Sequence, residues 1–124
     1  MKEVIAVFVG GGLGSVVRFG MARWLNAFSP YSFPLGTFVV NITACFVLGL
    51  VVGLVEHKLV LSPLSRVFWA IGFCGGFSTF STFSYENLLL IQTGQNGIML
   101  LYTLLSVVVC LAAVFSGQFL AARI

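Results

Sequence analysis

Serine and threonine side chains are interleaved with phenylalanines in residues 78–84, and this is the stretch whose side chains are best suited to chemistry. On a helix, Phe80 and Phe83 are three positions apart and share one face, while the hydroxyl groups occupy other faces. Helix packing, or a hydrogen bond from the hydroxyl to a nearby backbone carbonyl, explains one serine or threonine. It does not explain a run in which hydroxyl groups alternate regularly with phenylalanines, which we call the hydroxyl–phenylalanine ladder. We therefore interpret the ladder as a polar track of hydroxyl groups beside two aromatic rings.

A second group of polar side chains lies earlier in the chain. Thr37 and Asn41 are four positions apart, which places them on one face of a helix. The Asn41 amide has two donor hydrogens, and burying such a group without a partner costs about 1–3 kcal/mol. The amide therefore either forms a hydrogen bond between helices or faces a pore, and the neighbouring threonine favours a polar-lined path.

Arg18 lies well inside an apolar stretch, where an arginine costs about 2.5–3.5 kcal/mol on insertion scales. It reaches the nearer interface, binds a carbonyl or carboxylate, or lines an aqueous vestibule, and the sequence leaves these alternatives open. Near the end of the chain, Tyr102, Ser106 and Cys110 follow one another at spacing four. By itself this stripe is typical of helix packing.

The sequence argues against an enzyme and against a nucleic-acid-binding protein. It has no nucleophile–base pair and no cluster of metal ligands, and its six lysines and arginines are scattered singly rather than gathered in a patch. Cys45, Cys74 and Cys110 each lie inside an apolar stretch, so we interpret them as small hydrophobic residues that form neither a disulfide framework nor a metal site.

The elements that must position these residues are membrane-spanning helices. The chain is 60% hydrophobic and only 7% charged, and a soluble domain of 124 residues would not cover its surface with so few charges. A helix needs about 20 mainly apolar residues to cross a bilayer. Such stretches occur at about 4–25, 35–55, 64–91 and 98–121. We expect an all-α membrane protein with a single domain of four transmembrane helices over residues 1–124.

The third predicted span carries the polar track and does not suit a continuous helix. Gly75 and Gly76 stand just before the hydroxyl-rich run, and the stretch 64–91 is longer than one straight crossing requires. We therefore expect this helix to be broken close to the middle of the membrane. Broken backbone at that depth must be buried in protein or line a cavity, and its freed carbonyls commonly coordinate a cation.

The basic residues specify the orientation of the chain only weakly. With four spans, both termini share one side of the membrane with the second loop, and that side has a small excess of lysine and arginine. This excess favours a cytoplasmic amino terminus by the positive-inside rule. Because the excess is small, a chain with this charge pattern can insert in either orientation.

Three segments resemble the signatures of the Fluc (CrcB) family of fluoride channels. They are residues 10–18 (GGGLGSVVR), 36–41 (GTFVVN) and 72–83 (GFCGGFSTFSTF), of which the third is the most specific. The resemblance covers the whole chain in length, number of spans and order of motifs. It implies a passive, fluoride-selective channel in the plasma (inner) membrane that exports cytoplasmic fluoride. It also implies an antiparallel, dual-topology homodimer with two pores.

The same resemblance implies roles for individual residues. Gly75 and Ser78 would supply the backbone carbonyls that hold a central structural sodium ion, and Arg18 would be a vestibule or structural residue. The residues implied to form the fluoride pathway are Phe80, Phe83, Asn41, Thr37, Ser81, Thr82, Glu86, Tyr102 and Ser106.

The chemistry of fluoride agrees with these residue types, although two other functions stay open on the sequence. Fluoride holds its water tightly, so a pore must replace that water with protein donors, and the positive edge of an aromatic ring can contact an anion without trapping it. A small proton-coupled multidrug transporter normally needs a carboxylate in the first span, where this chain has Arg18; its only embedded acid is Glu86. A structural subunit without transport would not need the hydroxyl–phenylalanine ladder.

Overall fold

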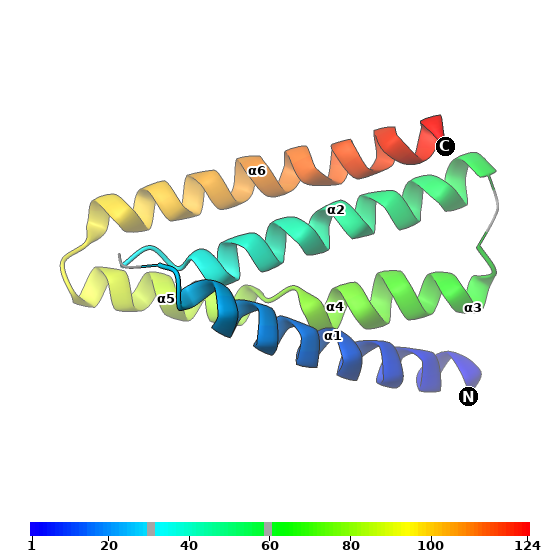
Figure 1. Cartoon of the computed structure of the whole chain (residues 1–124), viewed down its shortest axis with the longest axis horizontal. Helices are drawn as coiled ribbons and strands as arrows, with labels where there is room; N and C mark the ends of the chain where they lie inside the picture. The colour runs from blue at the N-terminus through cyan, green and yellow to red at the C-terminus, as the bar shows by residue number, and fades with distance from the viewer. Residues whose placement is uncertain (30–31, 59–60) are drawn as a thin grey trace.

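The computed structural model of the chain describes residues 1–29, 32–58 and 61–124, which form helices and turns and contain no strand. The helices are α1 (Lys2–Asn26), α2 (Leu35–Lys58), α3 (Pro63–Arg66), the π-helix η1 (Val67–Phe73), α4 (Cys74–Phe77), α5 (Phe80–Gln92) and α6 (Asn96–Arg123). The chain is therefore an all-α protein, as the sequence predicts (Figure 1).

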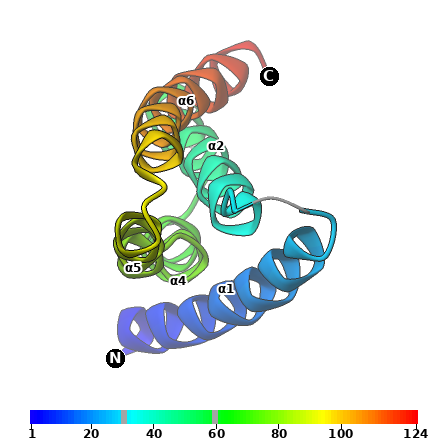
Figure 2. The same cartoon turned by 90° about the vertical axis from the view of Figure 1, so that its left-hand side faces the viewer.

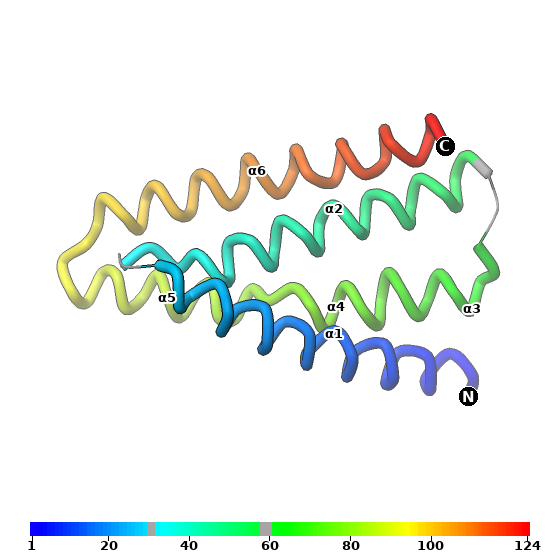
Figure 3. The backbone as a smooth tube through the Cα atoms, in the orientation of Figure 1, coloured from blue at the N-terminus to red at the C-terminus, as the bar shows by residue number. Residues whose placement is uncertain are grey.

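Three of the helices are long and apolar enough to cross a membrane: Lys2–Asn26, Leu35–His57 and Asn96–Arg123. They match the first, second and fourth predicted stretches. The third predicted stretch, 64–91, corresponds to the row of shorter helices from α3 to α5. Because α3, η1 and α4 follow one another directly, this row has one interruption, after Phe77, where the tube in Figure 3 straightens before α5.

Helices α2 and α6 lie side by side, while α1 crosses η1 and α4 on the other side of the molecule (Figure 2). The close approach of α2 to α6 depends on glycine. A β-carbon on Gly49 would overlap the carbonyl oxygen of Val114, and one on Gly117 would overlap that of Phe46. Small residues at helix contacts allow membrane helices to pack backbone against backbone.

The glycine-rich part of α1 forms a similar contact with the broken helical row. A β-carbon on Gly14 would overlap the carbonyl oxygen of Phe73, and one on Gly76 would overlap that of Gly11. These contacts hold α1 against the end of α4. They therefore fix the position of α4, whose carboxyl end leads into the interruption after Phe77.

The outer surface of the single chain is largely apolar. Its buried cluster is small and contains Val40, Ala44 and Phe77. On the outside, the side chains of Phe8 on α1 and Phe115 on α6 are 81% and 69% exposed. Span-length helices that expose large apolar side chains are typical of a multi-pass membrane protein, because lipid rather than water then covers them.

Candidate functional site

The interruption between α4 and α5 consists of two residues with extended backbone. Ser78 has φ −78° and ψ 156°, and Thr79 has φ −150° and ψ 120°. The side-chain amide of Asn41, on α2, forms hydrogen bonds to this interruption, called the break below, through both its nitrogen and its oxygen. Its Nδ2 donates to the Thr79 carbonyl oxygen at 3.2 Å, and its Oδ1 accepts from the Thr79 N–H at 2.9 Å. The two bonds satisfy the backbone of Thr79 where no helix can do so.

At the break, two backbone carbonyls lose the N–H partners that a continuous helix would give them. In a continuous helix, the Gly75 carbonyl would accept a bond from the Thr79 N–H, but that N–H donates to Asn41. The Ser78 carbonyl would accept from the Thr82 N–H, but that N–H donates at 3.3 Å to the Thr79 hydroxyl, which caps α5. Within the described part of the chain, both carbonyls thus lack the bond that a helix would give them, and a backbone cation site needs such carbonyls.

The hydroxyl of Thr79 also begins the polar track along α5. It lies 3.2 Å from the Ser81 hydroxyl, and it donates to the Thr82 hydroxyl at 3.2 Å. Ser81 and Thr82 are both exposed on the single chain. Thr79, Ser81 and Thr82 therefore form a connected set of hydroxyl groups that begins at the break and continues onto an outer face of the molecule.

A cavity of about 270 Å³ lies beside the break and is lined by residues from α2, α5 and α6. Asn41, Phe80, Phe83 and Ser106 all line it. The side chain of Ser106 is only 8% exposed, and its Oγ has no hydrogen-bond partner among the described residues. Asn41 Nδ2 has a second hydrogen besides the one it donates to Thr79. The cavity therefore combines two aromatic rings with two groups that can donate to an occupant.

The two phenylalanines form a tilted pair, with ring centroids 5.6 Å apart and an angle of 35° between their planes. Phe83 also contacts Tyr102, with centroids 4.9 Å apart and an angle of 50°. Tyr102 is completely buried, whereas Phe80 is 78% exposed. Tilted rings present part of their positive edges to neighbouring groups. An anion beside this pair would therefore meet ring edges as well as ring faces.

Glu86 joins three helices at the far end of the ring pair. Its Oε1 accepts a hydrogen bond from the Thr37 hydroxyl of α2, and its Oε2 accepts one at 3.4 Å from the Tyr102 hydroxyl of α6. The sequence predicts all three residues for one pathway, and the structure brings them together. The carboxylate has a donor on each oxygen, so it is positioned as a fixed acceptor between α2, α5 and α6.

Arg18 lines a second cavity, of about 470 Å³, on the side of the break that faces α1. Arg23 and the three threonines Thr37, Thr79 and Thr82 also line it, so the cavity has positive charge and hydroxyl groups beside apolar side chains. Of the compensations open to Arg18 on the sequence, the position of its side chain agrees with a polar vestibule. Thr79 lines both cavities and stands between them.

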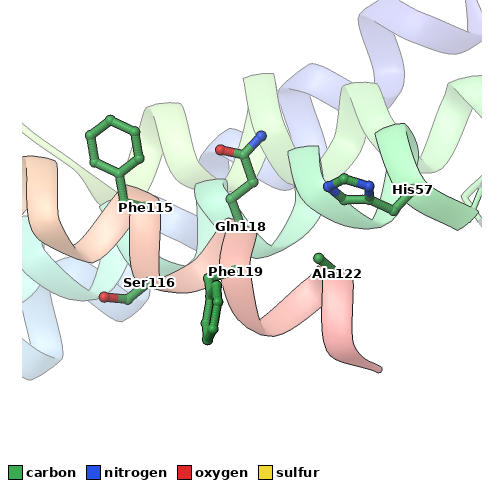
Figure 4. Close-up of a pocket in the computed structure, with 6 residues that line it drawn as sticks. All are labelled: His57, Phe115, Ser116, Gln118, Phe119 and Ala122. Carbon is green, nitrogen blue, oxygen red and sulfur yellow. The ribbon is translucent and has the colours of Figure 1, made fainter.

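A third cavity, of about 600 Å³, lies elsewhere, between the carboxyl ends of α2 and α6 (Figure 4). His57 and Gln118 line it together with Phe119. Gln118 Nε2 donates to Glu56 Oε2 at 2.7 Å. None of the residues predicted for the pathway lines this cavity. Its size alone does not make it the functional site.

Two cysteines that the sequence indicates only as small hydrophobic residues line the cavity beside the break. Cys45 of α2 and Cys110 of α6 both line it. They belong to different helices, so no spacing within one helix relates them. The only signal in the sequence is that Cys45 follows Asn41 at spacing four and Cys110 follows Ser106 at spacing four, which places each thiol one turn beyond a predicted pathway residue.

Comparisons with known proteins show which proteins the chain is similar to. A family model described as CrcB-like protein, Camphor Resistance (CrcB), matches residues 5–118. Three similar proteins are each named fluoride-specific ion channel FluC. The protein from Flavobacterium psychrophilum is 41% identical over 98% of this chain and 98% of its own length. The one from Gloeothece citriformis is 42% identical over 99% of both chains, and the one from Pyrococcus furiosus is 44% identical over 99% of this chain and 98% of its own length.

Proposed function

Because the chain belongs to the CrcB family, we propose that it is a fluoride-specific ion channel, not an enzyme, which carries fluoride passively out of the cytoplasm. The observation that carries this proposal is the cavity beside the break. There, Asn41 lines the same space as Phe80 and Phe83, together with Ser106, whose hydroxyl has no hydrogen-bond partner among the described residues. That combination suits a small anion that must exchange water for protein donors.

The lining of this cavity also suits release of the ion. Conduction requires binding that is favourable but weak, and no lysine or arginine is among the described residues that line the cavity. Hydroxyl and amide donors together with ring edges give several weak contacts instead of one strong one. In this proposal fluoride passes Asn41, Ser106 and the two rings. The pathway continues along Ser81, Thr82, Glu86, Thr37 and Tyr102, and Arg18 attracts the anion into the polar cavity next to it.

We further propose that the channel is an antiparallel homodimer with two pores. On the single chain, the side chain of Phe80 is 78% exposed, and Ser81 and Thr82 are also exposed. Hydroxyl groups directed at lipid would be costly, so a second copy is the natural cover for this face. Gly75 is exposed too, with nothing within 4 Å of the position of a β-carbon. Both copies would then place their broken helices at the shared interface.

A structural sodium ion at the centre of this dimer is part of the proposal. The donor set fits a hard cation, because the Gly75 and Ser78 carbonyls are deprived of their helical bonds and backbone oxygens suit such ions. The Ser78 hydroxyl donates to the Cys74 carbonyl at 2.8 Å and is engaged on its own helix. We therefore expect Ser78→Ala to keep the sodium requirement, and long dialysis into sodium-free buffer to abolish fluoride flux. Unchanged flux after such dialysis would contradict the sodium site.

We place the chain in the plasma (inner) membrane as one domain with four spans, the third being the row α3 to α5 with its break near mid-membrane.

A simple experiment tests the channel function. Liposomes that contain the purified protein are loaded with fluoride or with chloride, and anion efflux is followed with ion-selective electrodes. We expect rapid fluoride efflux that needs no proton gradient and little chloride efflux. Flux that depends on a proton gradient would favour a coupled transporter, and absence of flux would favour a structural subunit.

A further inference from the structure

We propose that Cys45 and Cys110 form a two-thiol site for a soft monovalent cation with linear coordination, such as Cu⁺, and that a cation bound there inhibits the channel. The thiols line the same cavity as Phe83 and Asn41. The binding of the cation is argued from the cavity and its two cysteines and does not depend on fluoride conduction. The inhibitory part rests on the proposed fluoride function.

The two cysteines line the cavity from two neighbouring helices. Cys45 belongs to α2 and Cys110 to α6, and these helices lie side by side. Both cysteines are only partly buried, so an ion that enters the cavity can reach them. Cys74 differs in position: it is buried and lines a smaller cavity of about 140 Å³ on the other side of Cys45.

A second observation indicates that this cavity takes an occupant. Ser106 lies one helical turn before Cys110, its side chain is 8% exposed, and its Oγ has no partner among the described residues. A buried hydroxyl without a bond costs about 1–3 kcal/mol. That cost falls when an ion or its water fills the cavity. The site is thus a polar, accessible space with two sulfur ligands.

The ligand set selects the class of cation. Thiolate sulfur is a soft donor that prefers ions such as Cu⁺ over hard ions. Among the described residues no group of three or more histidines, cysteines or acids lies together, so a tetrahedral zinc site does not fit and a two-coordinate ion does. On binding, each thiol loses its proton to solvent and each sulfur forms one bond to the metal.

The charge of the loaded site explains the inhibition. Two thiolates and one monovalent cation carry a net charge of −1, beside a path that must admit an anion. In a partly desolvated cavity this charge repels fluoride more strongly than it would in water. The bound metal also fills space between Asn41 and the rings. We therefore expect flux to fall about tenfold or more when the site is filled.

Silver is a suitable probe, because Ag⁺ shares the softness and linear coordination of Cu⁺ and is stable in air. The purified full-length protein is treated with silver nitrate in chloride-free buffer, desalted, and analysed for silver per chain. We expect one tightly held silver ion per chain in the unmodified protein and in Cys74→Ala. We expect that ion to be lost in Cys45→Ala and in Cys110→Ala. Equal silver content in all four proteins, or loss of silver in Cys74→Ala, would overturn the site.

Fluoride efflux from liposomes then tests the inhibition, with each protein compared with its own rate in the absence of silver. The unmodified protein and Cys74→Ala should be inhibited, and the two other variants should not. If silver binds to the cysteine pair but the efflux rate stays the same, the inhibitory part is wrong. If no protein conducts fluoride before silver is added, the channel function fails while the silver content still decides the binding site.

Discussion

At the scale of single residues, the described arginines lie outside the cavity that contains the two phenylalanines. The cavity beside the break holds Asn41 and Ser106 with the two phenylalanines, whereas Arg18 lines the cavity on the other side of Thr79. A full positive charge attracts fluoride from a distance, but it would hold the ion too firmly at a constriction. In the proposed pathway, the cavity beside Arg18 attracts the anion and the cavity beside the break lets it pass.

Replacing Phe80 or Phe83 with isoleucine tests the role of the ring edges. Isoleucine keeps apolar bulk but removes the positive edge, so we expect a folded dimer with strongly reduced fluoride flux in liposomes. Methionine, which is flexible and polarizable, should restore more flux than isoleucine. A role in packing alone predicts near-normal flux, since apolar swaps of similar size usually cost less than about 1.5 kcal/mol.

The matched control for these variants is Phe8→Ile. Phe8 is as exposed as Phe80 on the single chain, but it lies on α1 and lines none of the cavities described above. Its replacement should leave flux unchanged. Size-exclusion chromatography must show an intact dimer for each protein before flux is compared. Undiminished flux in both Phe80→Ile and Phe83→Ile would show that these two residues have a purely structural role.

The Ser106→Ala variant distinguishes a role of this hydroxyl in fluoride flux from a role in thermal stability. Removing a buried hydroxyl that has no partner in the described part of the chain should leave thermal stability unchanged or raise it by up to about 1 kcal/mol. Loss of a donor in the cavity should lower fluoride flux. Ser116→Ala on the same helix is the control, because its exposed hydroxyl donates to the Ala112 carbonyl at 2.7 Å. A variant at position 106 that loses stability and flux together would show that the hydroxyl supports packing.

At the scale of elements, the sequence predicts most of the helices because each has a local signal. Long apolar stretches specify α1, α2 and α6, and the paired glycines before a hydroxyl-rich run indicate where the third stretch ends its regular helix. The π-helix over Val67–Phe73 has no such signal, since its residues read as an ordinary apolar helix. The bonds from Asn41 to Thr79 and from Thr37 to Glu86 also escape prediction, because periodicity gives the face of a helix and not its partner.

The contact between α2 and α6 gives a prediction at this scale. A methyl group at Gly117 would overlap the carbonyl oxygen of Phe46, so Gly117→Ala should separate the helices and cost about 1–3 kcal/mol. Gly97, near the start of the same helix, has nothing within 4 Å of its β-carbon position, and Gly97→Ala should be neutral or slightly stabilising. Thermal unfolding in detergent measures both, and equal melting temperatures would show that the helices adjust without cost.

At the scale of the whole molecule, the small imbalance of charge gives a prediction about insertion. The chain has six basic and three acidic residues, with only a slight excess of lysine and arginine on one predicted side, so the positive-inside rule gives little preference. We expect copies in both orientations, as an antiparallel dimer requires. Carboxy-terminal fusions to reporters that are active on opposite sides of the membrane should both give signal. Signal from one reporter alone would exclude the dual-topology dimer.

The two bonds between Asn41 and Thr79 restrict how this protein can change through mutation. One side chain holds the break open, withholds the Thr79 N–H from the Gly75 carbonyl, and lines the cavity. Aspartate at position 41 would place an acceptor against the Thr79 carbonyl, and alanine would leave that backbone unpaired. Any substitution there alters the backbone of the break and the lining of the cavity at once. Engineering of ion preference must therefore begin on the α6 wall, at Ser106 or Cys110, where a side chain can be exchanged without disturbing the backbone.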